Sequence, residues 1–429
     1  MRYQPINPQL FEKNRARLSE MLPFGAIAIV NSNDQMPRNG DQYFPYRQHS
    51  DMFYLTGITQ EHSRLVLFPS HPDESMREIL FILRPNEEVE TWEGRKLRPH
   101  EAENISGIRH IRFNDQWEAT LRDLMTRAEL VFLNRNEYPK FFPEVEGVDD
   151  RFQREIRQLF PLHEYRRLAP LLWKLRVIKQ TEEIHLLTKA CNVTRDAFVR
   201  VLQAVKPGMW EYEIEAEITH EFIRLGCTHA YQPIIAGGVN ACSLHYNTND
   251  ALLRAGDLLL MDFGAEYANY AADCTRTIPV SGKFTPRQRQ VYEAVLRLQR
   301  HALRLLVPGS TINEVNAEMN ELATREMINL GLFTETDLEH QDPDHPLRIK
   351  YLMHGVTHYT GLDVHDVGWR DQPLEPGMVL TFEPAIYIRE EGIGIRLEDN
   401  IVVGYPSFNL MDDIPIEPDE IEEMMNGRY

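Results

Sequence analysis

Residues 253–277 read LRAGDLLLMDFGAEYANYAADCTRT and predict a β-hairpin that carries two acids. The expected order is an apolar strand, a polar turn and a return strand, at residues 258–261, 267–270 and 274–275. Asp262 and Asp273 lie roughly symmetrically about the turn, so we expect them to face each other, with Cβ atoms about 5 Å apart. Two carboxylates that close repel unless they share a proton or a cation. The ordinary alternative is one acid in a turn and one on a solvated face, but Asp262 ends a run that reads as buried.

A second stretch, residues 374–403, repeats this design as LEPGMVLTFEPAIYIREEGIGIRLEDNIVV. An apolar strand runs into Glu383, a polar turn follows, and the return strand carries Glu398. Both stretches open with Leu-x-x-Gly and place an acid six residues after the glycine, and a histidine precedes each acid, His245 in one case and His365 in the other. Each also follows a Pro-Gly break and a Glu-rich helical pattern. The repeat indicates an internal duplication, in which four matched acids form one centre for polyvalent cations.

The motif HGVTH at residues 354–358 spaces His354 and His358 as a zinc-binding helix would. Its glycine and threonine argue against a helix, and the second residue is glycine rather than a glutamate base. A histidine alone is as often a buried hydrogen-bonding residue. Four carboxylates and one imidazole form a hard set that suits Mn²⁺, Co²⁺ or Fe²⁺ and can hold Zn²⁺. Four carboxylates around one divalent ion would leave excess negative charge, so we expect two ions. Paired ions lower the pKa of a bridging water, which predicts hydrolysis.

Length and charge limit the other classes of function. A chain of 429 residues is too long for one ordinary core, so we expect two domains. The net charge of −19 argues against partners such as nucleic acid or an anionic membrane. The four cysteines show no C-x-x-C spacing, the N-terminus lacks an apolar signal region, and no run reaches membrane-spanning length. We therefore expect a reducing, cytoplasmic setting.

The first part of the chain alternates strand and helix patterns and predicts an α/β domain. We expect helices at residues 9–22 and 117–128 and strands at 26–30, 64–69, 79–83 and 130–133. A linker or linking helix should follow at 166–179, and Thr181 should cap a helix that ends near Val205. A further helix should run from Thr285-Pro286 to Pro308-Gly309. Two aromatic segments, 42–57 and 90–97, stand out, and inter-domain or subunit packing is the plainer interpretation of both.

Taken together, these motifs resemble the metallopeptidases of the pita-bread fold, and among them the bacterial Xaa-Pro aminopeptidase branch. The resemblance spans almost the whole chain and rests on an ordered set of segments: YRQHSDMFYLTG, TWEGR, RVIKQTEEI, LLMDFGAEY, DCTRT, HGVTHYTGLDVHDVG, LEPGMVLTFEPAIY and GIGIRLEDN. It implies an α+β chain with an α/β N-terminal domain at residues 1–170. A pita-bread catalytic domain with an internal pseudo-two-fold duplication would occupy residues 171–429.

The resemblance also implies roles for individual residues. The metal ligands would be Asp262, Asp273, His358, Glu383 and Glu398. Asp273 and Glu398 would bridge two divalent ions, with Mn²⁺ expected and Co²⁺, Fe²⁺ or Zn²⁺ as alternatives, and Glu383 would accept a proton from the bridging water. Substrate-binding and supporting positions would be His245, His354, His365, Arg396, Tyr387, Trp92 and Asp41. The last two would approach the active site within a homodimer or homotetramer.

The activity implied is removal of the first residue from peptides with proline in second place. An Xaa-Pro bond is a tertiary amide without an N–H, and proline fixes φ, so general peptidases handle it poorly. Within the same fold, a prolidase acting on Xaa-Pro dipeptides shares every ligand and is the main alternative. Methionine aminopeptidase lacks the large N-terminal domain, and creatinase lacks the metals. A pita-bread binding protein without catalysis is the alternative from another class, although such proteins usually lose ligands and none of the five is missing here.

Overall fold

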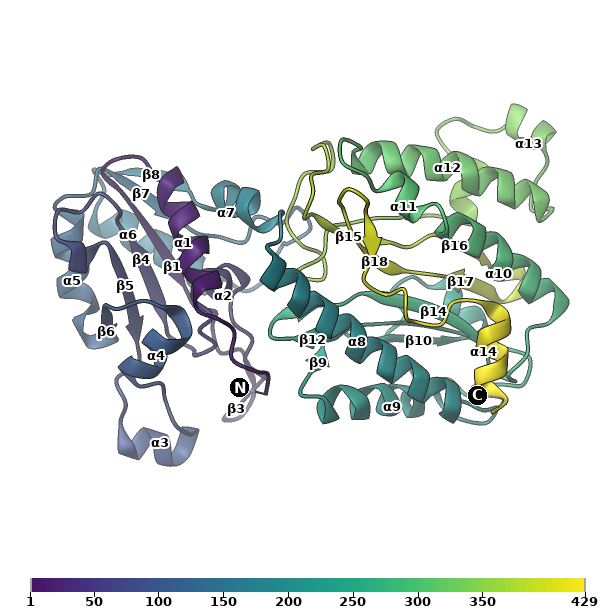
Figure 1. Ribbon diagram of the computed structural model, residues 1–429, viewed down its shortest axis with the longest axis horizontal. Coiled ribbons are helices and arrows are strands. Elements are labelled where there is room, and N and C mark those ends of the chain that lie inside the picture. Colours follow the sequence, from purple (N-terminus) through teal and green to yellow (C-terminus); the bar gives the residue numbers. More distant parts are fainter. Residues whose placement is uncertain (1, 428–429) are drawn as a thin grey trace. The chain divides into compact units, whose positions relative to one another are not determined.

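The computed structural model describes residues 2–427 and contains two compact units that meet in sequence between Arg176 and Val177. Figure 1 shows the first unit in purple and blue and the second in teal, green and yellow. Each unit has its own buried apolar side chains. Within residues 2–427, no helix combines the length and the apolar character needed to cross a membrane.

The first unit is built on a six-stranded mixed sheet with the order β6-β5-β4-β1-β7-β8. Its strands are β1 Ala26–Asn31, β4 Arg64–Leu67, β5 Glu78–Ile82, β6 Ile111–Phe113, β7 Leu130–Leu133 and β8 Glu164–Arg167. A small hairpin, β2 Pro37–Asn39 and β3 Gln42–Tyr43, stands outside the sheet. The helices are α1 Gln9–Met21, α2 Ser50–Thr56, α3 Glu87–Glu93, α4 Pro99–Ser106, α5 Trp117–Met125, α6 Val148–Leu159 and α7 Ala169–Arg176.

Alternating strand residues form the core of this unit. Ile27 and Ile29 project from β1 to the same face, where they pack with Trp117 of α5 and Phe152 of α6. Burying each side chain of this size contributes about 1.5–3 kcal/mol. Helix α2 contacts β1 and β4, and α1 packs on α2. The helices and strands expected between residues 9 and 133 are confirmed. The linking helix expected within residues 166–179 is α7, which follows β8 and accommodates Pro170 in its first turn because an N–H there needs no helical partner.

The second unit repeats one arrangement twice. The first half contains α8 Thr181–Ala204, α9 Glu211–Arg224, β9 Thr228–His229, β10 Ile234–Gly237, η3 Gly238–Cys242, β11 Leu258–Phe263, β12 Ala265–Tyr267, β13 Tyr270–Ala271 and β14 Cys274–Pro279. The second half contains α10 Pro286–Gln299, α11 Ala302–Leu305, α12 Ile312–Asn329, α13 Glu335–Glu339, η4 Leu347–Lys350, β15 Val379–Phe382, β16 Ala385–Ile388, η5 Arg389–Glu391, β17 Ile393–Arg396, β18 Asp399–Val402, β19 Phe408–Asn409 and α14 Pro418–Met425.

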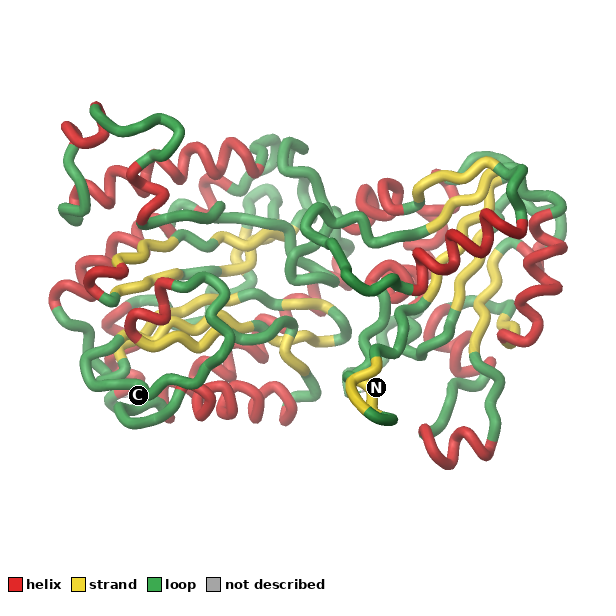
Figure 2. The backbone as a smooth tube through the Cα atoms, turned by 180° about the vertical axis from the view of Figure 1, so that it is seen from behind, coloured by secondary structure: helices red, strands yellow, loops and turns green. Residues whose placement is uncertain are grey.

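Helices cover the strands of each half in a matching way. In the first half α8 packs on β12 and β13, and α9 packs on β10. In the second half α10 packs on β16 and β17, and α12 packs on α10. Figure 2 shows the strands of this unit in yellow between red helices. The duplication inferred from the two hairpin sequences is therefore visible in the packing.

Two expected helix boundaries are wrong. Gln180, not Thr181, is the N-cap of α8, because the Gln180 N–H donates to Glu183 Oε2 at 2.9 Å and closes the first turn one residue earlier. The helix that begins after Thr285 ends at Gln299, and the chain turns before the short α11. Both errors are local and leave the hairpins in place.

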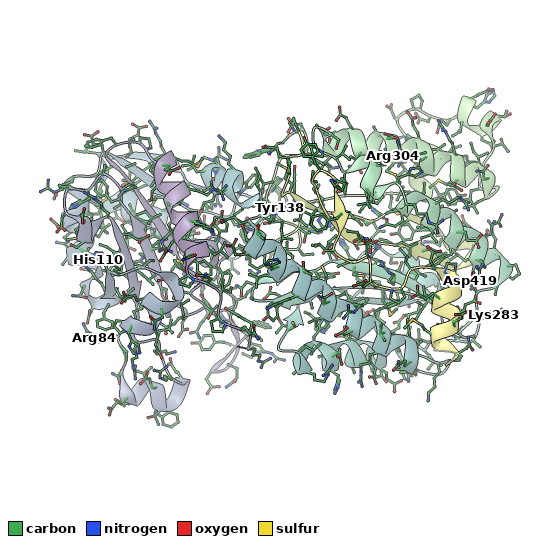
Figure 3. The ribbon with its side chains drawn as sticks, viewed as in Figure 1. Arg84, His110, Tyr138, Lys283, Arg304 and Asp419 are labelled. Carbon is green, nitrogen blue, oxygen red and sulfur yellow. The ribbon has the colours of Figure 1, made fainter. Side chains whose placement is uncertain are left out.

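Charged side chains lie on the outside of both units, as Figure 3 shows for Arg84, Arg304 and Asp419. Arg84 pairs with Asp115 at 2.6 Å, and Arg304 pairs with Glu318 at 2.7 Å. Exposed pairs of this kind contribute about 0–1 kcal/mol each. The buried side chains, rather than these pairs, hold the two folds together.

Candidate metal centre

The first hairpin places Asp262 and Asp273 on one face but not directly opposite each other. β11 and β14 pair so that Asp262 faces Thr275, which puts Asp273 on the diagonal, two residues away. The symmetrical arrangement expected from the sequence is wrong because the hairpin closes on a two-residue turn, Ala268–Asn269, in which both residues have positive φ. That turn moves the centre of the pairing by one residue. Diagonal neighbours on one face remain within reach of a shared partner.

Tyr231 is that partner. Its hydroxyl lies 2.6 Å from Asp262 Oδ1 and 2.6 Å from Asp273 Oδ1. A phenol carries one proton, so it donates to one carboxylate at a time and holds both in the same place. Tyr231 comes three residues before β10, which pairs antiparallel with β11 and brings Ile234 opposite Asp262.

The second hairpin places Glu383 and Glu398 at opposed positions, as expected. Phe382 pairs with Asp399 in strands β15 and β18, and Ala385 pairs with Arg396 in strands β16 and β17. The same register continues through the residues between these pairs, so Glu383 lies across from Glu398. The two hairpins then join at Thr275 and Glu398, which form an antiparallel bridge. The Glu398 N–H donates to the Thr275 carbonyl at 3.0 Å, and the Thr275 hydroxyl donates to Glu398 Oε2 at 2.6 Å. All four acids therefore belong to one site.

His358 completes the cluster from the loop at residues 354–368, the histidine loop. Its Nε2 lies 3.4 Å from Asp273 Oδ2 and 3.7 Å from Glu383 Oε1. Its Nδ1 lies 3.0 Å from the Tyr359 carbonyl oxygen, which can only accept, so Nδ1 carries a proton and Nε2 faces the acids. Asp273, His358 and Glu398 each offer a ligand atom, and these atoms lie within 4.8 Å of one another. No helix forms at HGVTH, as expected from its glycine.

The acids carry the electrostatic signature of a cation site. Burial, and then neighbouring acids, raise the pKa of Glu398 well above its usual range. Burial also raises the pKa of Glu383 to about 7. It raises the pKa of Asp262 as well, although the positive charge of Arg396 acts in the opposite direction. Burial alone would lower the pKa of His358, but Asp273 and Glu383 outweigh it and raise the pKa to about 9. Positive charge at this place would relieve the repulsion, so the oxygen-rich donor set fits divalent cations.

Arg396, Tyr387 and His354 form a hydrogen-bonded chain beside the acids. Arg396 donates to Asp262, to Thr275 Oγ1 at 3.0 Å and to the Tyr387 hydroxyl at 2.7 Å. Because it accepts from Arg396, the Tyr387 hydroxyl donates to His354 Nε2 at 3.0 Å. His354 Nδ1 then donates to the Gly355 carbonyl at 2.9 Å. Burial and Arg396 lower the pKa of His354 to about 4, so its ring is neutral at neutral pH.

The remaining predicted histidines are more exposed. His245 lies in the turn after η3. The pKa of His354 is lowered by burial first, then by the charge of Arg396, with a further contribution from His245. The His365 ring packs edge-on against His358, with 4.5 Å between ring centroids and an interplanar angle of 88°. His365 therefore borders the cluster from its solvent side, whereas His245 is exposed and acts on the charge of His354.

Asp41 and Trp92 belong to the first unit, and their role at the site stays a prediction. Asp41 is exposed in the turn between β2 and β3, and Trp92 lies on α3 with 86% of its surface exposed.

Sequence reasoning missed Tyr231 and Thr275 as parts of the site. Tyr231 opens the segment YQPIIAGG, whose apolar run could have been paired with the strand that ends at Asp262. Thr275 follows Asp273 by two residues, and the strand period of two would have placed it on the same face. Neither signal names a partner without the cross-strand register.

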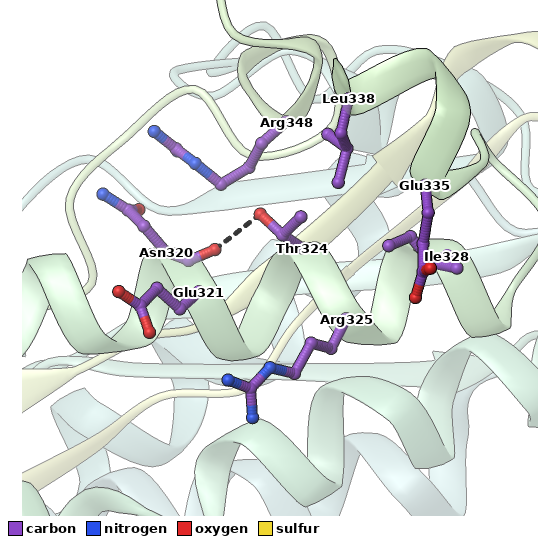
Figure 4. A pocket seen from close by; sticks show the side chains of 8 residues that line it. All are labelled: Asn320, Glu321, Thr324, Arg325, Ile328, Glu335, Leu338 and Arg348. Carbon is purple, nitrogen blue, oxygen red and sulfur yellow. Dashed lines mark hydrogen bonds between the residues drawn. The ribbon is translucent and has the colours of Figure 1, made fainter.

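A groove of about 500 Å³ lies elsewhere in the second unit, between α12, α13 and η4. Figure 4 shows its lining, in which the Thr324 hydroxyl donates to the Asn320 carbonyl within α12 at 2.7 Å. Its walls mix acids, arginines and two aliphatic residues, Ile328 and Leu338. None of the predicted site residues lines this groove.

Comparison with known proteins agrees with the geometry over the whole chain. The Xaa-Pro aminopeptidase of Escherichia coli (strain K12) is 36% identical over 440 residues, covering 98% of this chain and 98% of that protein. The Xaa-Pro aminopeptidase of Haemophilus influenzae is 35% identical, covering 97% of each chain. The solved structure of Escherichia coli aminopeptidase P in complex with substrate matches with a TM-score of 0.88 and 34% identity, covering 99% of each chain.

These likenesses confirm the expected fold class, an α+β chain with an aminopeptidase P N-terminal domain and a pita-bread C-terminal domain. The aminopeptidase P N-terminal domain model matches residues 11–132, and the model of metallopeptidase family M24 matches residues 185–404. The second match includes all five predicted ligands. The chain therefore belongs to metallopeptidase family M24 and carries an N-terminal domain of the aminopeptidase P type.

Proposed function

We propose that this protein is a dinuclear metal-dependent aminopeptidase that hydrolyses the N-terminal Xaa-Pro bond of peptides. The observation that carries the proposal is the convergence of Asp273, His358 and Glu398, whose ligand atoms lie within 4.8 Å of one another. Family M24 membership and relatives described as Xaa-Pro aminopeptidases support it. The prolidase alternative is not favoured, because the relatives quoted above are described as aminopeptidases rather than dipeptidases.

In this proposal the five ligands are Asp262, Asp273, His358, Glu383 and Glu398. Asp273 and Glu398, which are buried and lie where the two hairpins meet, would hold the ions from the centre of the cluster. His358 offers Nε2 because Nδ1 is engaged by the Tyr359 carbonyl. Mn²⁺ suits this carboxylate-rich set, with Co²⁺, Fe²⁺ or Zn²⁺ as alternatives.

Paired divalent ions, when bound, polarise a carbonyl group and lower the pKa of a coordinated water to near neutrality. Glu383 is suited to accept and return a proton because its carboxylate lies within the cluster, with Oε1 3.7 Å from His358 Nε2. The proline nitrogen released from a tertiary amide needs such a proton. Both ring nitrogens of His354 are engaged, one by the Tyr387 hydroxyl and one by the Gly355 carbonyl, so this histidine would orient Tyr387 beside the site. The exposed His365, whose ring packs on His358, is suited to donate a hydrogen bond to oxygen that gains negative charge.

We also propose a reducing, cytoplasmic setting and a homodimer or homotetramer. All four cysteines are free and buried, which fits a compartment where thiols stay reduced. The exposure of Trp92 fits a role at a subunit contact near another subunit's site. Light scattering coupled to size-exclusion chromatography distinguishes these assemblies from a monomer.

The decisive experiment compares an Xaa-Pro dipeptide with an Xaa-Pro-Xaa tripeptide, after removal of metal by chelator and after restoring Mn²⁺. We expect release of the first residue from the tripeptide only with Mn²⁺, and little cleavage of the dipeptide. Glu383→Gln should abolish this activity, whereas the matched variant Glu390→Gln, in an exposed turn, should leave it unchanged. Preference for the dipeptide would indicate a prolidase. No hydrolysis of either peptide with any divalent ion would indicate a binding protein and refute the proposal.

A further inference from the structure

An ion pair between Lys179 and Asp366 is buried beneath the histidine loop. Lys179 Nζ lies 2.9 Å from Asp366 Oδ2, and each side chain is only 1% exposed. Moving two charges out of water costs free energy that their attraction barely offsets, so such a pair is a poor source of stability. Its position next to the candidate metal centre points instead to a geometric role.

Lys179 is fixed against the start of the second hairpin. Its N–H donates to the Gly377 carbonyl at 2.9 Å, and the preceding Ile178 forms an antiparallel bridge with Met378. Met378 immediately precedes β15, the strand that leads to Glu383. The lysine therefore projects from a rigid support rather than from a mobile linker.

Asp366 is the residue after His365 and closes the histidine loop on itself. Its N–H donates to the Tyr359 carbonyl at 2.9 Å, so the loop turns back between these two residues. The ion pair holds the end of this loop, and the His365 ring packs on His358 at 4.5 Å. A shift of Asp366 would therefore move His365 and with it the surroundings of the His358 ring.

Gly361 shows how closely the loop is fitted to the pair. A Cβ at this position would lie 2.3 Å from Asp366 Oδ2 and 2.7 Å from Lys179 Cε. The Gly361 carbonyl accepts from the Ala271 N–H of the first hairpin at 2.8 Å. Only glycine leaves room for the buried pair while the loop contacts that hairpin.

A second contact ties the same helix end to the first hairpin. Glu183, in the first turn of α8, accepts from the Tyr270 hydroxyl at 3.0 Å and from the Gln180 N–H at 2.9 Å. Tyr270 lies three residues before Asp273. The N-terminal end of α8 therefore contacts both the hairpin that carries Asp273 and, through Lys179, the loop that carries His358.

We propose that Lys179 and Asp366 are positioning residues, which hold His365 and His358 where they act on the peptide and the metal. Neither is among the predicted ligands or substrate-binding residues. The inference rests on the proposed function for its catalytic part, whereas its metal-binding part can be measured without any turnover. It also gives a role to the RVIKQTEEI segment, which the metal centre itself does not use.

The test compares the single variants Lys179→Met and Asp366→Asn with the double variant Lys179→Met/Asp366→Leu. The double variant removes both charges of the pair, so it should melt higher than Lys179→Met alone, which leaves Asp366 buried without its cation. All three should bind Mn²⁺ about 10- to 100-fold more weakly in calorimetric titration of the metal-free protein. They should also lower kcat for the tripeptide about tenfold or more at saturating Mn²⁺, with KM changed less.

Arg176→Met is the matched control, because Arg176 and Asp51 form another buried pair, at 2.8 Å, in the first unit. It should lower the melting temperature and leave Mn²⁺ affinity unchanged. A double variant that is stable, binds Mn²⁺ like the wild-type protein and keeps its kcat would overturn the proposal. If that variant does not fold, Asp366→Asn, which keeps volume and an acceptor, decides by the same two measurements. Failure of the wild-type protein to cleave the tripeptide would refute the proposed function, while the Mn²⁺ titrations would still test the positioning role.

Discussion

The Thr275 hydroxyl donates a 2.6 Å hydrogen bond to Glu398 Oε2, and these two residues also form the backbone bridge between the hairpins. Thr275 Oγ1 in turn accepts from Arg396. One hydroxyl therefore aligns a carboxylate of the second hairpin with the strand that follows Asp273. The duplicated halves meet at a place where side-chain and main-chain bonds fix the same acid.

Replacing Thr275 with valine keeps the shape of the side chain and removes this bond. We expect Thr275→Val to weaken Mn²⁺ binding about tenfold or more, because the oxygens of Glu398 lose their orientation. Calorimetric titration of the metal-free protein measures the change. Thr194→Val is the control, since Thr194 is another buried threonine and bonds only backbone groups, at Ala190 and Ala265. Equal affinities in the two variants would show that Thr275 does not orient Glu398.

Tyr231 offers a second substitution that removes a single oxygen. Tyr231→Phe should leave Asp262 and Asp273 without their shared donor, so we expect about a tenfold loss of Mn²⁺ affinity. Tyr246→Phe is matched to it, because the Tyr246 hydroxyl donates to a carboxylate, Glu211, outside the cluster, at 2.6 Å. Unchanged affinity in Tyr231→Phe would mean that the two aspartates are held by the strands alone.

The stability of the metal-free protein should fall as the pH rises from 5 to 9. Burial raises the pKa of Glu383 to about 7, so its contribution is fully present below its unfolded value and is lost as the pH passes 7. Burial alone would lower the pKa of His358, but the neighbouring acids raise it to about 9. The stability that His358 contributes is therefore also lost as the pH rises from its unfolded pKa to about 9. Thermal melting at several pH values, with chelator present, measures this slope.

Restoring Mn²⁺ should raise the melting temperature most at the high end of this range, because binding requires the deprotonated ligands. The variant Glu398→Gln should separate the effect of charge repulsion from the effect of metal binding. It removes one buried negative charge, so we expect the metal-free protein to become more stable at pH 8 and to respond little to Mn²⁺. A metal-free protein whose melting temperature does not change with pH would contradict the electrostatic account of the cluster.

His354 and His358 should differ in charge although they are four residues apart. Burial and Arg396 lower the pKa of His354 to about 4, whereas the neighbouring acids outweigh burial and raise that of His358 to about 9. In the metal-free protein at pH 7 we expect a neutral His354, protonated at Nδ1, and a charged His358. Nitrogen-15 spectra of histidine-labelled protein report the ring states, and the variants His354→Gln and His358→Gln assign the signals. A charged His354 at pH 7 would remove it as a neutral partner of Tyr387.

The amino-acid sequence by itself determined the two hairpins and the four candidate acids, whereas the choice of His358 as the fifth ligand came from the resemblance to the metallopeptidases. Apolar runs that end in acids, the repeated Leu-x-x-Gly opening and the matched acid spacing all depend on local pattern. Glu383 and Glu398 were placed across from each other correctly because their hairpin keeps one register through its turn. The glycine and threonine of HGVTH also argued against a helix there, although the histidine spacing alone would fit one, and the structure has no helix at these residues.

Only the tertiary structure decided which groups support those ligands. The diagonal placement of Asp262 and Asp273 depends on a turn whose residues, Ala268 and Asn269, adopt positive φ, and alanine gives no signal for that conformation. Lys179 and Asp366 are separated by 187 positions and meet only after the two halves have packed. Residues with single, long-range contacts leave no periodic trace in a sequence, because periodicity records which face is buried and not which partner is met.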